Sequence, residues 1–123
     1  YADRREAIDA AAKKQDDTKA VELLKTALKD KYFGLRNYAL GKLDMKKENV
    51  KKELEAIIVD LAKTDAKSVV RARALGLLSN YNKAAYKEIL EKALNDSSYS
   101  VAGTALEALG KMDEKKKNKN LDH

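Results

Sequence analysis

Apolar residues recur at helical spacing along most of the chain. Three segments carry apolar positions three and four residues apart, which places them on one face of a helix. These positions are Val21, Leu24, Ala27 and Leu28; Leu54, Ile57, Ile58, Leu61 and Ala62; and Ile89, Leu90, Ala93 and Leu94. Each segment is followed by an aspartate and then by a second helical pattern. The chain is therefore predicted to consist of helical hairpins.

The second helical pattern keeps a fixed spacing from the aspartate. Apolar residues stand at +5, +9, +10 and +13 from Asp30, Asp65 and Asp96. They are Leu35, Ala39, Leu40 and Leu43; Val70, Ala74, Leu75 and Leu78; and Val101, Ala105, Leu106 and Leu109. An arginine occupies +6 in the first two copies, and Ala102 replaces it in the third. The aspartates lie 35 and 31 residues apart, a period typical of helical repeats.

This periodicity predicts an all-α fold, a right-handed α-α superhelix of about seven helices. The expected helices span 2–15, 17–29, 32–44, 47–63, 67–80, 83–94 and 98–112. Residues 1–112 form the repeat domain, with a truncated repeat at 1–15, repeats near 17–44, 47–80 and 83–112, and a polar tail at 113–123. The truncated repeat keeps Arg4, Ala7, Ile8 and Ala11 at +6, +9, +10 and +13. The segment KMDEKKKNKNLDH indicates a hairpin that leads to a further polar helix, and we expect the chain to be part of a longer protein.

The repeated charged residues Asp30, Arg36, Asp65, Arg71 and Asp96 are predicted to be structural. Each aspartate can accept hydrogen bonds from N–H groups at the start of the helix that follows it. Each arginine can reach the aspartate of its own or the next repeat. The alternative is that the arginines bind an anionic ligand.

An interaction surface is also predicted on the second helices of the repeats, where Arg36, Arg71 and Arg73 lie. Stacked repeats bind partners through such extended faces.

Two glycines, Gly41 and Gly76, share the +11 position. A glycine inside a helix costs roughly 1 kcal/mol relative to alanine. The register therefore predicts a close approach of helices at this position, whereas Gly34 lies in a first helical turn.

The amino-acid composition favours helices and excludes several kinds of metal and catalytic site. The chain has no proline, tryptophan or cysteine, so thiolate metal sites and disulfides are excluded. The only histidine is His123, the last residue, so neither an HExxH motif nor a Ser–His pair can be built inside the fold. We expect no catalytic residue, no metal site and no cofactor in this chain. No apolar run approaches the roughly 20 residues that cross a membrane.

The net charge of +6 is a reason to consider nucleic acid as a binding partner. Residues 111–123 hold +2 of this charge, and the remaining +4 is interleaved with acidic groups. Only five of the 26 basic residues are arginines, which favours a solvated surface over a nucleic-acid groove. Five tyrosines are expected to be partly buried and to cover hairpin ends rather than to stack on bases: Tyr32, Tyr38, Tyr81, Tyr86 and Tyr99.

The hairpin motif resembles HEAT repeats over nearly the whole chain. It reads DxxxxLR from Asp30 and DxxxxVR from Asp65, while DSSYSVA at 96–102 lacks the arginine. The stretches DKYFGLRNYALGKLD and SSYSVAGTALEAL are similar to the HEAT-like C-terminal region of M1-family zinc aminopeptidases. This resemblance implies an accessory domain that closes over a catalytic domain, with zinc and its ligands outside this chain.

Three function classes stay open from the sequence. The first is an accessory domain whose partner is a neighbouring domain of a metallopeptidase. The second is a stand-alone scaffold that binds another protein. The third is a DNA-binding HEAT protein of the alkylpurine-glycosylase kind, which would gather arginines and aromatic residues on one face.

Overall fold

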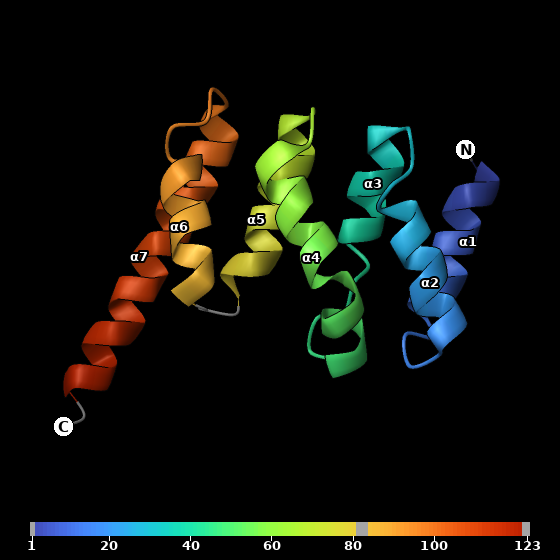
Figure 1. Ribbon diagram of the computed structural model, residues 1–123, viewed down its shortest axis with the longest axis horizontal. Coiled ribbons are helices and arrows are strands. Elements are labelled where there is room, and N and C mark those ends of the chain that lie inside the picture. Colours follow the sequence, from blue (N-terminus) through green and yellow to red (C-terminus); the bar gives the residue numbers. More distant parts are fainter. Residues whose placement is uncertain (1, 81–83, 122–123) are drawn as a thin grey trace.

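The computed structural model describes residues 2–80 and 84–121, which form seven α-helices and no strand (Figure 1). The helices are α1 (Ala2–Ala12), α2 (Thr18–Ala27), α3 (Phe33–Leu40), α4 (Glu48–Thr64), α5 (Ser68–Ser79), α6 (Ala84–Ala93) and α7 (Tyr99–Leu121). The predicted all-α, solenoid-like fold is confirmed. Its right-handed sense stays a prediction.

The helices form a row of hairpins that runs from α1 at one end to α7 at the other (Figure 1). Helices α2–α3, α4–α5 and α6–α7 are the three hairpins, and α1 packs on the first of them. The second helix of each repeat contacts the second helix of the next: α1 meets α3, α3 meets α5, and α5 meets α7. We call these four helices the second-helix layer.

The core lies between the layers and consists of the residues that the repeat spacing singles out. At +5, +9 and +10 the side chains have 0% exposure in the first two copies: Leu35, Ala39, Leu40, Val70, Ala74 and Leu75. Burying one such leucine or valine stabilises the fold by about 1.5–3 kcal/mol. The third copy keeps Val101 and Ala105 buried but exposes 65% of Leu106.

Two predictions about helix ends were wrong. Helix α3 ends at Leu40, so Gly41 is its C-cap residue and not a mid-helix glycine. Helix α7 does not stop near residue 112 but continues to Leu121, so there is no hairpin at 111–121. The lysines, glutamate and methionine after Gly110 are good helix formers, and no glycine or proline follows to end the helix. His123 lies outside the described residues.

The predicted close approach of helices at the +11 glycines was wrong at Gly76, and at Gly41 only a side chain approaches. A Cβ at Gly41 would lie 2.7 Å from Nη1 of Arg73, so an arginine side chain of the next repeat covers this glycine. A Cβ at Gly76 would meet nothing within 4 Å, so no close approach requires that glycine. At Gly34, the ring of Tyr32 lies over the backbone, 2.5 Å from where a Cβ would stand.

The tyrosines differ in burial more than expected. Tyr86 is buried with 4% exposure, and Tyr38 is half-buried. Tyr32 is 46% exposed and thus partly buried, whereas Tyr99 is 94% exposed, so the prediction of partly buried tyrosines was wrong for Tyr99. Tyr81 lies outside the described residues.

Candidate functional site

The repeated arginines and aspartates pair across neighbouring repeats. Nε of Arg36 donates to Oδ2 of Asp65 at 2.8 Å, and Nη2 donates to Oδ1 at 2.9 Å. The third nitrogen, Nη1, donates to the backbone carbonyls of Asp30 at 2.9 Å and Lys31 at 3.1 Å. The guanidinium therefore joins the hairpin turn of its own repeat to the aspartate of the next repeat.

Arg71 repeats this geometry one hairpin further along. Its Nε and Nη2 donate to the two carboxylate oxygens of Asp96 at 2.9 and 3.0 Å, and its Nη1 donates to the carbonyl of Asp65 at 2.7 Å. Arg4 likewise pairs with the aspartate of the following repeat, Asp30, with 3.2 Å between Nε of Arg4 and Oδ2 of Asp30. We call these three pairs the arginine ladder. Ala102 stands where the next arginine would be, so the ladder ends at Asp96.

Each ladder aspartate also binds the start of the helix that follows. Oδ1 accepts the N–H group two residues further on: Tyr32 for Asp30, Lys67 for Asp65 and Ser98 for Asp96, each at 2.9 Å. Tyr32 and Lys67 are the N-cap residues of α3 and α5, so these bonds hold the turns just before the helices.

Pairing with arginine lowers the pKa of the two inner aspartates of the ladder, Asp65 and Asp96. Burial by itself raises the pKa of Asp65, but the hydrogen bonds from Arg36 and Lys67 and the nearby arginine charges outweigh it and lower the pKa. The hydrogen bond from Arg71 lowers the pKa of Asp96, and the Ser98 N–H acts in the same direction. Both carboxylates therefore stay ionised in the folded protein at neutral pH.

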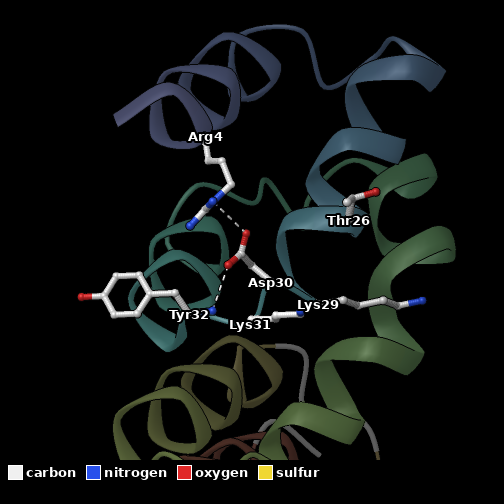
Figure 2. A pocket seen from close by; sticks show the side chains of 6 residues that line it. All are labelled: Arg4, Thr26, Lys29, Asp30, Lys31 and Tyr32. Atoms are coloured by element: carbon white, nitrogen blue, oxygen red, sulfur yellow. Dashed lines mark hydrogen bonds and ion pairs between the residues drawn. The ribbon is translucent and has the colours of Figure 1, made fainter. Parts of the chain in front are cut away.

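The first pair of the ladder is the most open and borders a surface hollow (Figure 2). The hollow lies between α1 and the α2–α3 turn and is lined by Arg4, Thr26, Lys29, Asp30, Lys31 and Tyr32. Arg4 points from α1 to the carboxylate of Asp30, and its side chain is 57% exposed. The side chains of Arg36 and Arg71 are only 13% and 15% exposed.

Arg36 and Arg71 belong to the ladder, but Arg73 does not. Arg73 is exposed, and its Nε donates to Oδ1 of Asn37 at 2.8 Å, between α5 and α3. The three arginines predicted as one interaction surface therefore do not form one exposed set, because two of them are engaged inside the hairpin turns.

Further basic side chains lie along the same second-helix layer. The guanidinium of Arg5 stacks over the ring of Tyr38 at 4.4 Å, and Nζ of Lys42 lies 5.0 Å from the same ring. Asp9 accepts a hydrogen bond from the hydroxyl of Tyr38, and Nζ of Lys42 lies 3.9 Å from Oδ1 of Asp9. We call Arg5, Lys42 and Arg73 the basic row. Its members come from α1, the α3–α4 loop and α5, and thus from three successive repeats.

A buried glutamine, which the sequence pattern did not predict, lies at the opposite end of the hairpins. Gln15 is 5% exposed, and its amide donates to the carbonyls of Ala12 at 2.9 Å and Lys42 at 2.8 Å. Its Oε1 accepts the N–H of Asp44 at 2.8 Å. Gln15 therefore ties the α1–α2 loop to the α3–α4 loop. The residue pattern does not predict this role of Gln15, because its partners are backbone groups of a loop that is distant in the sequence.

The described residues offer no metal centre. Within 2–80 and 84–121, no group of three or more histidine, cysteine, aspartate or glutamate side chains could hold a metal ion. Zinc therefore does not fit this part of the chain. In the same ranges, no helix is both long enough and apolar enough to cross a membrane.

A family model described as HEAT repeats matches residues 54–122, which is more than half of the chain. No curated protein matches the chain. The matched residues include α4 from Leu54 onward, helices α5, α6 and α7, and the Arg71–Asp96 pair of the ladder.

Proposed function

Since the chain belongs to the HEAT-repeat family, we propose that it is a non-catalytic protein-interaction domain that contacts a partner through its second-helix layer. The observation that carries this proposal is the basic row. Arg5, Lys42 and Arg73 project from three successive repeats, and Tyr38 and Asn37 orient their charged groups. Side chains held in one orientation lose less conformational entropy when a partner binds.

The chemistry of the basic row favours an acidic partner segment. Guanidinium groups bind carboxylates through paired hydrogen bonds, and a lysine adds a point charge. Asp9 also contacts this row, where it pairs with Tyr38 and Lys42. A carboxylate-rich segment that crosses α1, the start of the α3–α4 loop and α5 would meet a cation at each of them.

Charge reversal on the basic row tests this proposal. Arg73→Glu and Lys42→Glu should weaken binding of a fluorescein-labelled oligoglutamate peptide, measured by anisotropy at low and at physiological salt. Lys52→Glu is the matched control, because this exposed residue on α4 gives the same change in net charge on the other layer. Equal losses for all three variants would show only a response to net charge and would contradict the proposed surface.

A second, more specific proposal concerns the longer protein of which this chain would be a region. The resemblance of DKYFGLRNYALGKLD and SSYSVAGTALEAL supports an accessory region of an M1-type zinc aminopeptidase, in which the partner is the catalytic domain and zinc lies there. The decisive comparison is the parent enzyme with and without residues 1–123, assayed on short and long peptides. Lost activity or an altered length preference supports this parentage. A parent without a metallopeptidase domain, or an unchanged preference, leaves the stand-alone scaffold as the better account.

A further inference from the structure

Arg73 differs from the other two members of the basic row in its charged surroundings. Nζ of Lys42 lies 3.9 Å from Oδ1 of Asp9, and Arg5 stacks on Tyr38, whose hydroxyl donates to the same aspartate. Helices α3 and α5, between which Arg73 lies, contain no aspartate or glutamate. Among the described residues, no acidic group pairs with Arg73, so its positive charge is not neutralised there.

Asn37 and Gly41 together fix where the guanidinium group of Arg73 lies. Oδ1 of Asn37 accepts a hydrogen bond from Nε of Arg73 at 2.8 Å. The same guanidinium lies over Gly41, where a Cβ would stand 2.7 Å from Nη1 and 3.6 Å from Cζ. A side chain at this position would displace the guanidinium, so glycine makes room for it. The equivalent glycine of the next repeat, Gly76, has open space around it.

The hydrogen bond to Asn37 decides how Arg73 can bind an anion. In the ladder, Arg36 and Arg71 bind their aspartates through Nε and Nη2. In Arg73 the single N–H of Nε already donates to Asn37, so this mode is not open to it. The two terminal nitrogens, Nη1 and Nη2, remain as donors. Two parallel N–H groups of a guanidinium match the two oxygens of one carboxylate.

A single carboxylate suits this site better than a phosphate group. Arg73 carries one positive charge, which one carboxylate balances. A phosphate monoester carries a charge of about −1.5 to −2 at neutral pH, so it needs a second cation. Lys42 follows Gly41 in the sequence, but its ammonium group is paired with Asp9.

We propose that Arg73 is the anchor of the basic row and binds one glutamate or aspartate side chain of the partner through Nη1 and Nη2, with Asn37 and Gly41 as positioning residues. This inference rests on the function proposed above, in which an acidic segment binds the row. The geometry of the guanidinium group, and not only its charge, then decides the affinity.

Variants that keep the net charge test the anchor. The probe is the labelled oligoglutamate peptide with an amidated C-terminus, so that side chains supply its carboxylates, and anisotropy gives the affinity. Arg73→Lys keeps the charge but loses the paired donors, so it should weaken binding about threefold to tenfold. Asn37→Ala and Gly41→Ala should each weaken it about threefold, because the guanidinium is released or displaced. Gly76→Ala is the matched control and should leave the affinity unchanged.

A double-mutant cycle separates positioning of Arg73 from a general effect on the fold. In the Arg73→Ala background, Asn37→Ala and Gly41→Ala should cause no further loss of affinity, because no guanidinium is left to position. Thermal melting checks that each variant is folded, and Asn37→Ala carries the test where Gly41→Ala is not. A further loss in that background, or unchanged affinity for the three charge-conserving single variants, would overturn the anchor.

The outcomes distinguish this inference from the proposed function. Absence of oligoglutamate binding, or equal losses for Arg73→Glu, Lys42→Glu and Lys52→Glu, contradicts both. Where the charge reversals act as proposed but the charge-conserving variants do not weaken binding, only the anchor is wrong. A gain of more than about tenfold when phosphoserine replaces one glutamate of the probe would assign the site to a phosphate group and overturn the anchor as well.

Discussion

At the scale of single residues, the arginine ladder shows how much the spacing alone can predict. The spacing identified the aspartates and arginines but left open whether each arginine reaches its own or the next repeat. The structure shows that each inner arginine does both: the aspartate comes from the next repeat and the carbonyl from its own turn. The turn geometry that decides this is not visible in a residue pattern.

Removal of a ladder carboxylate should destabilise the protein more than removal of an exposed one. Asp65→Ala leaves Arg36 and the Lys67 N–H without their acceptor at an 8% exposed position. We expect a loss of about 3 kcal/mol in the free energy of unfolding. Asp60→Ala, at an exposed position on α4, should change it by no more than about 0.5 kcal/mol. Urea unfolding measures both, and equal losses would contradict the role of the ladder.

The ladder also predicts a dependence of stability on pH. The pKa of Asp96 is lowered in the folded state, so its contribution is complete above its ordinary value of 3.8 and is lost as the pH falls through the folded pKa. The difference in unfolding free energy between the wild type and Asp96→Asn should therefore be constant between about pH 7 and pH 5 and shrink as the pH falls from about 4 toward 2. Urea unfolding at several pH values checks this. A difference that stays constant or grows on acidification would show that the charge of Asp96 does not stabilise the fold.

At the scale of helices, the apolar periodicity predicted the number of elements but not all of their ends. Helix α3 stops at Leu40, and Gln15 bonds to the carbonyl of Lys42 and the N–H of Asp44 just beyond it. Those contacts join loops that are 27 and 29 residues apart in the sequence. Local propensity contains no information about them.

The two glycines of the +11 position should respond differently to alanine. Gly76→Ala places a methyl group in open space within α5 and should raise the free energy of unfolding by about 0.5–1 kcal/mol. Gly41→Ala must displace the guanidinium of Arg73, so we expect a smaller gain or a loss. Thermal melting of both variants measures the difference. A lower melting temperature for Gly76→Ala would show that this position needs glycine after all.

At the scale of the whole molecule, the sequence predicted a row of repeats but not which charges remain exposed. Arg36 and Arg71 are taken up by the ladder, whereas Arg73 remains on the surface with Lys42. The difference depends on which side of its helix each arginine occupies relative to the next hairpin. Burial by a neighbouring repeat likewise decides that Leu75 is core and Leu106 is surface.

Binding to DNA should be weak, salt-sensitive and independent of sequence. The repeats carry an excess charge of only +4, spread among acidic groups, so they can neutralise few phosphates. Anisotropy titrations with two unrelated duplexes at low and at physiological salt measure this. Tight binding to one duplex at physiological salt would favour the DNA-binding class over the interaction domain.

The offset pairing of the ladder bears on how such a chain can lengthen during evolution. Because each arginine and its aspartate lie in successive repeats, a duplication of residues 31–65 would supply a new Arg36 together with the Asp65 that it binds. The carbonyl that the copied arginine needs would come from the preceding Asp65, as it already does for Arg71. An inserted period would thus satisfy its own ion pair and leave the flanking pairs intact. The array can gain or lose units by unequal recombination without any compensating substitution in the ladder.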